Sequence, residues 1–227
     1  MTTISQKLMT VKNKILQAEQ INHREANAVK LLAVTKTQPV SVITEAIQAG
    51  QLYFAENYLQ EALPKIEALK NEELEWHFIG PIQSNKTKGI AENFHWVHSI
   101  DRLKIAERLQ MQRPIYLPKL QVCIEVNVDE DPAKSGVKLN ELTVFAHEVN
   151  QFPQLQLRGL MTILAQYTDK TRIAESYNKL RMVYEKLQSE GFNLDTLSMG
   201  MSADYEIAIA CGSTCVRIGS AIFGERS

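Results

Sequence analysis

The sequence predicts an α/β fold, a single (β/α)8 barrel with one extra helix at its amino-terminal end. Eight short apolar runs alternate along the chain with segments of helical periodicity, a pattern typical of parallel sheets covered by helices. Eight such units in one chain favour a closed TIM barrel over an open sheet. An open dinucleotide-binding sheet is the weaker alternative, because no Gly-x-Gly-x-x-Gly motif opens the first helix after a strand.

The first half of the chain contains four predicted strands. We expect these strands over 31–34, 52–55, 76–79 and 95–100. A helix over 4–29 precedes the first strand, and the helices between the strands run from Pro39 to a cap at Gly50, over 59–69, and from about 84. Pro64 lies inside the third of these helices, where it should kink or shorten the helix.

The second half repeats the pattern four times. Asp101 can cap a helix that carries Leu103 and Leu109. After it we expect a strand over 120–128, a polar loop over 129–136, a helix around 142–149, a strand over 155–163, a helix over 169–188, a strand over 196–198, a helix over 202–211 and a strand over 215–218. We therefore expect residues 1–227 to form one domain, with the helical segment 1–29 packed on the barrel.

Composition excludes several classes of protein. The net charge of −1 gives no indication of nucleic-acid or membrane-surface binding, and the apolar runs are far shorter than a membrane span requires. The first residues lack the layout of a signal peptide. Three cysteines without a Cys-x-x-Cys pair favour neither a disulfide framework nor a metal site. We expect a cytoplasmic protein with reduced thiols.

Lys36 is the leading candidate for chemistry. It follows the apolar run 31–34, so it lies at the carboxyl end of the first strand, which is the working face of such barrels. A desolvated lysine is the kind that forms Schiff bases. The alternative is a surface lysine just past a strand end.

Two segments near the end of the chain contain glycine and serine in a pattern that suits phosphate binding. They are Ser198-Met199-Gly200-Met201-Ser202 after the seventh strand and Gly219-Ser220 after the eighth. Asp204 and Glu206 would repel a phosphate at the first segment, so we favour Gly219-Ser220 as the stronger donor pair. Ordinary turn chemistry is the alternative for both segments.

A Schiff-base lysine and a phosphate-binding site on the same face of the barrel together indicate pyridoxal 5′-phosphate. Arg217 stands two residues before the second phosphate segment. An arginine that faces the pyridine nitrogen keeps this nitrogen unprotonated, which weakens the ring as an electron sink. The alternative for Arg217 is an ion pair with a neighbouring carboxylate such as Glu125.

The histidines carry less information. His95 and His98 are three residues apart on a strand and face opposite sides, so they cannot share a metal. His77 lies within the third strand, where a hydrogen-bonded core histidine is more common than a ligand.

At this point the motifs resemble a known family. The chain is similar over its full length to the pyridoxal phosphate homeostasis proteins, also called PLP-binding proteins, whose barrel is like the amino-terminal domain of alanine racemase. The matching segments are 33–37 (AVTKT), 54–58 (FAENY), 76–80 (WHFIG), 83–86 (QSNK), 134–136 (KSG), 158–161 (RGLM), 197–202 (LSMGMS) and 217–224 (RIGSAIFG).

The resemblance implies a role for each matched position. Lys36 would hold the cofactor covalently and Arg217 would face its pyridine nitrogen. The remaining contacts implied by the resemblance, to the phosphate or the pocket wall, are Asn57, His77, Ser198, Met199, Gly200, Ser202, Gly219 and Ser220. In one departure from the family, Ala55 stands where glycine is usual, and this would strain the turn if a positive φ is required there.

Three functions compete. The resemblance implies a non-catalytic PLP carrier in vitamin B6 and amino-acid homeostasis. We expect a monomer, because the second domain that forms the racemase dimer interface is missing, and we expect PLP-dependent apoenzymes as recipients. A PLP-dependent amino-acid racemase is the alternative, but it needs acid–base groups on both faces of the cofactor, and Tyr58 and His77 are the only candidates. It also needs a second domain, for which 227 residues leave no room. A Schiff-base aldolase without PLP would need a carboxylate relay near Lys36.

Overall fold

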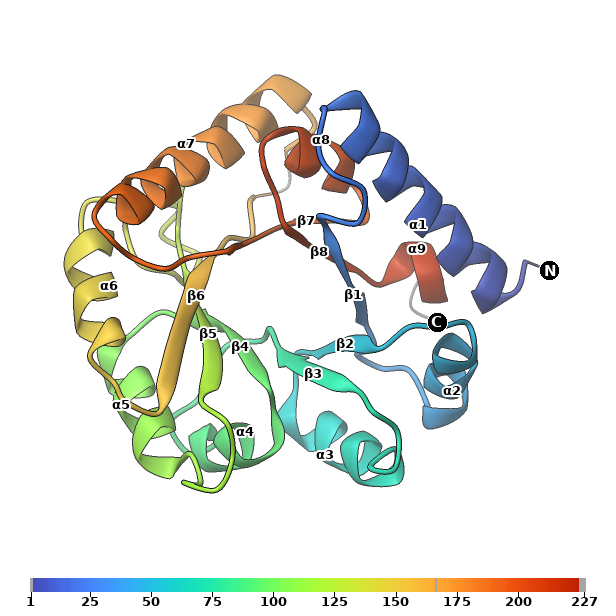
Figure 1. Cartoon of the computed structure of the whole chain (residues 1–227), viewed down its shortest axis with the longest axis horizontal. Helices are drawn as coiled ribbons and strands as arrows, with labels where there is room; N and C mark the ends of the chain where they lie inside the picture. The colour runs from blue at the N-terminus through green and yellow to red at the C-terminus, as the bar shows by residue number, and fades with distance from the viewer. Residues whose placement is uncertain (1, 166, 225–227) are drawn as a thin grey trace.

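Eight parallel strands close into a barrel in chain order, with β1 paired to both β2 and β8. The architecture comes from a computed structural model that describes residues 2–165 and 167–224. Figure 1 shows the strands at the centre with the helices around them. The predicted fold class is confirmed.

The strands begin and end close to the predicted positions, with two exceptions. They are β1 (Lys30–Val34), β2 (Tyr53–Glu56), β3 (Glu75–Phe78), β4 (Trp96–Ile100), β5 (Leu120–Glu125), β6 (Leu155–Met161), β7 (Thr196–Met201) and β8 (Cys215–Ile218). Strand β5 ends three residues early, because Val126 leaves the ladder and makes an isolated bridge to Val137. Strand β7 runs three residues longer, with a register shift against β8 between Ser198 and Met201.

The helices follow the predicted alternation. They are α1 (Ile4–Ile21), α2 (Val40–Gln48), α3 (Leu59–Ala68), α4 (Thr87–Asn93), α5 (Leu103–Gln112), α6 (Leu142–Asn150), α7 (Lys170–Ser189), α8 (Tyr205–Ala210) and α9 (Ser220–Phe223). Pro64 neither ends α3 nor splits it into two helices. The short α9 was not predicted.

Helix α1 ends eight residues before the predicted boundary. It begins with a capping box at Thr3 and stops at Asn22, after which His23 and Asn27 adopt positive φ. The buried carboxylate of Glu19 accepts hydrogen bonds from the backbone N–H groups of Asn27 and Val29, so it fixes the loop that leads into β1. A helical continuation would lose both of these bonds.

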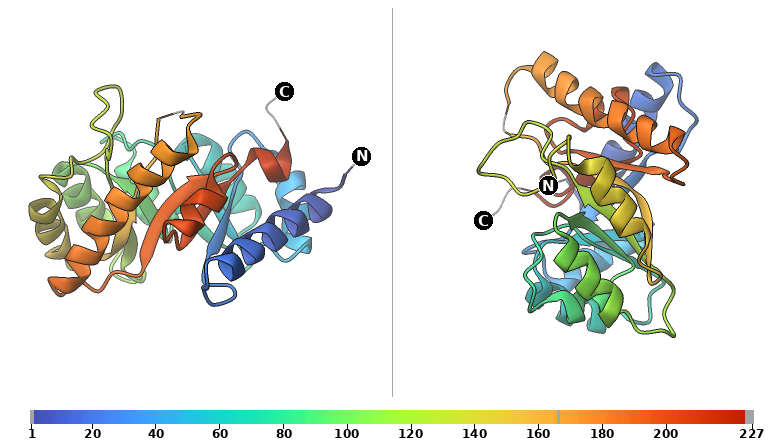
Figure 2. Two further views of the ribbon diagram at one scale, coloured as in Figure 1. Left: turned by 90° about the horizontal axis from the view of Figure 1, so that it is seen from above. Right: turned by 90° about the vertical axis from the view of Figure 1, so that its left-hand side faces the viewer.

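Apolar side chains of α1 anchor it to the outside of the barrel. Leu8, Val11, Ile15 and Ala18 are buried on one stripe of the helix. The helix lies beside α2, α8 and α9, as Figures 1 and 2 show from different directions. It therefore covers the seam where the first and last strands meet.

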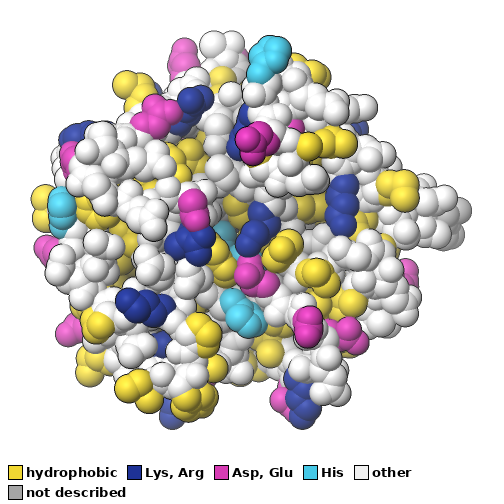
Figure 3. Space-filling model, viewed as in Figure 1, with side chains coloured by type: hydrophobic (Ala, Val, Ile, Leu, Met, Phe, Trp, Pro, Cys, Tyr) yellow, Lys and Arg dark blue, Asp and Glu magenta, His cyan; other side chains and the backbone are white. Residues whose placement is uncertain are grey.

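Charges of both signs are interspersed on the surface. Figure 3 shows one face of the molecule, with basic and acidic side chains side by side near its centre. This distribution fits the net charge of −1. Within residues 2–165 and 167–224, no helix is long and apolar enough to cross a membrane.

Candidate functional site

A cavity of about 660 Å³ opens at the carboxyl ends of the strands. Six of the residues predicted from the sequence line it, and they come from β8 and from the segments that follow β1, β2, β7 and β8. These residues are Lys36, Asn57, Ser202, Arg217, Gly219 and Ser220. The parallel barrel thus brings together positions that are up to 184 residues apart in the sequence (36 to 220).

Hydrogen bonds of Thr35 stabilise the turn that carries Lys36. Thr35 is fully buried; its Oγ1 donates to Glu56 Oε1 over 2.7 Å, and its carbonyl accepts from Lys65 Nζ over 2.8 Å. Thr37 has a φ of +64°, and its N–H donates to the Glu61 carboxylate. Lys36 therefore projects from a turn held on both sides.

A buried ion pair supports this turn. Lys65 Nζ lies 2.7 Å from Glu56 Oε1, and the two side chains are 9% and 0% exposed. Burial raises the pKa of Glu56, although Lys65 and Thr35 oppose the shift through hydrogen bonds. The sequence did not predict Lys65, because a lysine on a surface helix is normally exposed.

Asn57 presents an orphaned polar atom at the cavity. Its Oδ1 is buried and has no hydrogen-bond partner within the described part of the chain. Its backbone carbonyl packs directly on Gly80, where an added Cβ would come within 2.0 Å of that oxygen. Gly80 therefore lets the β2 loop approach β3, and Asn57 is left with an acceptor that a ligand can satisfy.

Ala55 causes no strain in this arrangement. It lies in β2, fully buried, and it is not among the residues with positive φ. The position requires a small side chain and not a left-handed backbone, so alanine replaces glycine here without conformational cost.

Arg217 is held by neutral oxygens. Its Nη1 donates to Ser198 Oγ over 2.7 Å, its Nη2 donates to the Thr162 carbonyl over 2.8 Å, and the residue is 3% exposed. Glu125 lies near enough for Arg217 to affect it. Burial raises the pKa of Glu125 to about 7 and Asp101 adds to this, against the opposing charge of Arg217. The guanidinium stays positive and reaches the cavity from β8.

The segments after β7 and β8 meet at one side of the cavity. Ser202 Oγ accepts a hydrogen bond of 3.5 Å from the backbone N–H of Ala221. An added Cβ on Gly219 would come within 3.3 Å of the Val34 carbonyl, so glycine allows this segment to lie against β1. Hydroxyl and backbone N–H donors of this kind suit an anion such as phosphate.

Hydrogen bonds within the protein engage the carboxylate of Asp204. Its Oδ1 accepts from the backbone N–H of Met201 and its Oδ2 accepts from the Tyr177 hydroxyl. Asp204 and Glu206 line a separate hollow beside α1. The repulsion expected from the sequence is weakened, because both oxygens of Asp204 accept hydrogen bonds within the protein and neither Asp204 nor Glu206 is among the described residues that line the cavity.

Four predicted residues lie outside this cavity. Ser198 is fully buried in the barrel core beneath Arg217, and Met199 packs in the apolar core. Gly200 has a φ of +98°, and an added Cβ there would come within 2.6 Å of Ala208 Cβ, so its role is to let α8 pack on β7. His77 lies toward the opposite mouth of the barrel, where it contacts Glu75 and His98.

The donor set fits one kind of ligand. An amine, a positive guanidinium, an orphaned acceptor and a group of hydroxyl and backbone N–H donors surround one space. An aldehyde that carries both a ring nitrogen and a phosphate would satisfy all of them. The fit rests on the residues alone and uses the carboxyl-end face that barrels use for ligands.

Several of the known proteins that are similar to this chain are pyridoxal phosphate homeostasis proteins. The alanine racemase N-terminal domain family matches residues 12–227. The chain is 48% identical to the pyridoxal phosphate homeostasis protein of Escherichia coli, with 100% of this chain and 98% of that protein covered. It is 50% identical to the Pseudomonas aeruginosa protein of the same name, with 100% and 97% covered.

Several solved structures share the fold of this chain. PipY of Synechococcus elongatus with PLP bound matches with a TM-score of 0.85 at 32% identity, over 98% of this chain and 100% of that one. An unknown protein from Bifidobacterium adolescentis matches with a TM-score of 0.92 at 33% identity, over 97% and 94%. Alanine racemase of Clostridium difficile, at 16% identity and a TM-score of 0.75, shares the fold over 94% of this chain and 55% of its own.

Proposed function

The chain belongs to the pyridoxal phosphate homeostasis protein family, and we propose that it binds pyridoxal 5′-phosphate covalently through Lys36. One observation carries this proposal. Lys36, Arg217 and the Ser202, Gly219 and Ser220 donors, which are dispersed in the sequence, line a single cavity. PLP is a phosphate-bearing aldehyde with a ring nitrogen, and it needs these three kinds of group.

Lys36 supplies the covalent bond. Its amine would hold the aldehyde of PLP as a Schiff base, with the carbonyl oxygen released as water. The Thr35–Glu56–Lys65 hydrogen bonds hold the turn beneath the amine, which limits the directions from which it reaches the cavity.

Arg217 faces the ring nitrogen. A guanidinium can donate but cannot accept or release a proton at neutral pH, so it keeps this nitrogen unprotonated. When bound, PLP supplies an electron sink, and an unprotonated nitrogen makes that sink weak. Ser202, Gly219 and Ser220 hold the phosphate, and the buried Oδ1 of Asn57 accepts a hydrogen bond from the cofactor.

The protein acts as a carrier and not as a racemase. Racemisation needs an acid–base group on each face of the cofactor. Among the described residues that line the cavity, Lys36 is the one whose side chain is of a type that commonly serves as a general acid or base. Tyr58 is 54% exposed on the rim of α3 and His77 lies toward the other mouth, so neither lines the cavity. This arrangement supports a protein that stores the cofactor and does not use it in catalysis.

The cellular role follows from the open site. Lys36 is partly exposed at the barrel rim, so a bound cofactor can be exchanged with solvent or with a PLP-dependent apoenzyme. We place the protein in the cytoplasm as a monomer that takes part in vitamin B6 and amino-acid homeostasis. Its three cysteines are buried and free, which agrees with a reducing compartment.

Retention of added PLP tests the proposal. The purified protein should develop a visible absorption band with PLP and keep it through dialysis. Lys36→Ala should lose the band on dialysis with an unchanged circular dichroism spectrum, whereas Lys12→Ala, a matched lysine on α1, should keep it. A band retained equally by Lys36→Ala would overturn covalent binding. Chiral chromatography should detect no racemisation of L-alanine by the PLP-loaded protein. Racemisation at an enzymatic rate would overturn the carrier role.

A further inference from the structure

A chain of polar side chains crosses the apolar barrel core beneath Arg217. Ser198 Oγ accepts from Arg217 Nη1 over 2.7 Å and lies 2.8 Å from His98 Nδ1. His98 Nε2 lies 2.9 Å from His77 Nδ1, and His77 Nε2 lies 2.9 Å from Glu75 Oε1. These residues come from β8, β7, β4 and β3, so the chain runs from one side of the barrel to the other.

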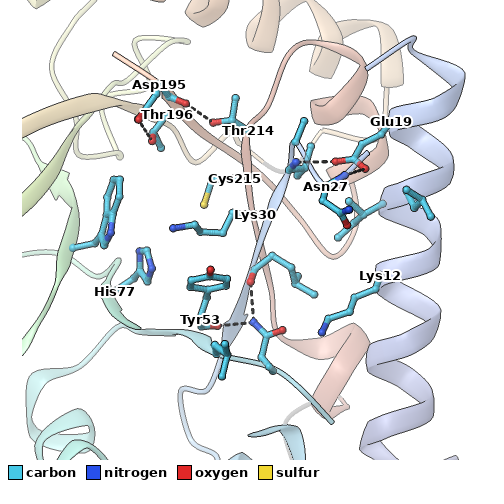
Figure 4. Close-up of a pocket in the computed structure, with 18 of the residues that line it drawn as sticks. Lys12, Glu19, Asn27, Lys30, Tyr53, His77, Asp195, Thr196, Thr214 and Cys215 are labelled. Atoms are coloured by element: carbon cyan, nitrogen blue, oxygen red, sulfur yellow. Dashed lines mark hydrogen bonds between the residues drawn. The ribbon is translucent and has the colours of Figure 1, made fainter. Parts of the chain in front are cut away.

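The outer end of this chain lies at the opposite mouth of the barrel. Lys30 and His77 line a cavity of about 570 Å³ there. Glu75 Oε1 accepts from both His77 and Lys30, the latter over 2.8 Å. Figure 4 shows Lys30 reaching across this cavity toward the side where His77 lies, with Tyr53 and Cys215 on either side of it.

The charge state of each member follows from its surroundings. Burial pushes the pKa of Glu75 upward, but hydrogen bonds from His77 and Lys30 outweigh it and lower the pKa to about 2, so this carboxylate is ionised. Burial lowers the pKa of His77 to about 4. Burial, with the positive charges of Arg217 and Lys30, lowers the pKa of His98 well below its usual range. Both histidines are therefore neutral.

These charges give every hydrogen bond one direction. An ionised Glu75 can only accept, so His77 Nε2 carries the proton and its Nδ1 accepts from His98 Nε2. His98 Nδ1 then accepts from the Ser198 hydroxyl, whose oxygen accepts from Arg217. The chain thus donates without interruption from the guanidinium to the carboxylate, and bonds aligned in this way polarise one another.

We propose that Ser198, His98, His77 and Glu75 are positioning residues that orient Arg217 and couple its effective charge to the Lys30–Glu75 pair at the far mouth. The inference rests on the proposed function, because it assigns Arg217 to the cofactor nitrogen. The negative end of the chain partly offsets the positive charge that Arg217 presents to the cofactor. Glu125 of β5 also interacts with Arg217, and it is not a member of the hydrogen-bonded chain.

A pair of substitutions at His98 separates the two halves of the chain. The amide of asparagine takes the place of Nδ1, so His98→Asn keeps the bond to Ser198. The amide of glutamine takes the place of Nε2, so His98→Gln keeps the bond to His77. We expect both to lower the pH midpoint at which the absorption band of bound PLP titrates, because a more positive Arg217 disfavours the protonated chromophore. His98→Gln, which releases Ser198, should have the larger effect.

Substitutions at the far mouth test the coupling without touching the core. Lys30→Met removes the positive charge that offsets the negative charge of Glu75. The full charge of Glu75 then acts on the hydrogen-bonded chain, so the pH midpoint of the PLP band should rise. Glu75→Gln should lower it. Lys12→Met is the matched control, since Lys12 lines the same cavity but bonds to the Gly50 carbonyl, outside the chain.

The outcomes are distinct from those of the proposed function. Opposite shifts for Lys30→Met and Glu75→Gln, with no shift for Lys12→Met, support the coupling. Equal shifts for Lys30→Met and Lys12→Met, or none for any variant, overturn it, provided that borohydride still fixes PLP to Lys36. If PLP is not fixed there in the unmodified protein, the proposed function fails instead.

Discussion

Arg217 is buried beside the cavity and held by hydrogen bonds within the protein. Its guanidinium is held by Ser198 Oγ and the Thr162 carbonyl, not by a carboxylate. The sequence left an ion pair with Glu125 open as an alternative. The hydrogen bonds favour a guanidinium that is held in place but not neutralised, and is therefore able to act on a ligand.

Replacement of Arg217 should change the spectrum of the bound cofactor more than its retention. In Arg217→Ala the ring nitrogen loses its donor, whereas the Lys36 bond and the phosphate contacts remain. The absorption band after dialysis should shift in position with most of its intensity kept. Arg158→Ala, at the other mouth, is the control and should leave the band unchanged. If the band lost its intensity as much as it changed in position, Arg217 would be only structural.

Glu125 should make stability depend on pH. Burial raises its folded-state pKa from 4.5 to about 7, so the folded chain binds more protons than the unfolded chain between these values. The free energy of unfolding therefore falls as the pH rises through this window, by at most about 3 kcal/mol from this group. The lowered pKa of His77, about 4, acts in the opposite direction over part of the range.

The comparison with Glu125→Gln isolates this contribution, because His77 is common to both proteins. Urea unfolding at about pH 5 and about pH 8 should show that the glutamine variant gains stability relative to the unmodified protein at the higher pH. A difference between the two proteins that is the same at both pH values would contradict the assignment.

At the level of elements, β7 differs from its prediction within the segment that was expected to bind phosphate. The sequence predicted a strand over 196–198 followed by a phosphate loop, whereas the strand continues to Met201. Gly200 sits in this extension with a φ of +98° and its Cα faces Ala208 on α8. Its glycine is needed for the packing of a helix on a strand, which only the three-dimensional contact reveals.

Gly200→Ala should destabilise the fold more than Gly191→Ala. Both glycines have a φ near +97° (98° and 96°), so each alanine costs about 1–2 kcal/mol in backbone strain. An added Cβ meets nothing within 4 Å at Gly191 but comes within 2.6 Å of Ala208 Cβ at Gly200. Urea unfolding midpoints measure the difference. Equal losses would show that the α8 contact adds nothing.

The sequence predicted the elements and one mouth of the barrel better than the interior. The strands could be predicted because apolar runs alternate with helical stripes, and parallel closure then brings Lys36, Arg217 and Ser220 to the same end. The path from Ser198 through His98 to His77 could not be predicted, because it depends on which strands face each other across the core. Lys65 was missed because its burial depends on a tertiary ion pair with Glu56.

At the scale of the whole molecule, α1 lies outside the barrel and shares the main apolar core with it. Leu8 is 1% exposed and belongs to the main apolar cluster, and the helix contacts α9, which carries Ser220. We propose that residues 1–227 fold as one unit, with the amino-terminal segment 1–29 packed on the barrel.

Leu8→Ala should destabilise the whole barrel and not α1 alone. The cavity should lower the free energy of unfolding by about 2–5 kcal/mol. Helical circular dichroism and the fluorescence of Trp76 and Trp96 should give one common transition, shifted equally. Met9→Ala, on the same helix but 62% exposed, is the control and should have little effect. Separate transitions for the two signals would show that α1 is an independent appendage.

Chemical fixation of the cofactor tests the central claim most directly. The PLP-loaded protein is reduced with borohydride, which converts the carbon–nitrogen double bond to a stable single bond, then digested and mapped by mass spectrometry. We predict one modified peptide, labelled at Lys36. A label on another lysine, or no label on a protein that has taken up PLP, would contradict the assignment of Lys36 as the covalent site.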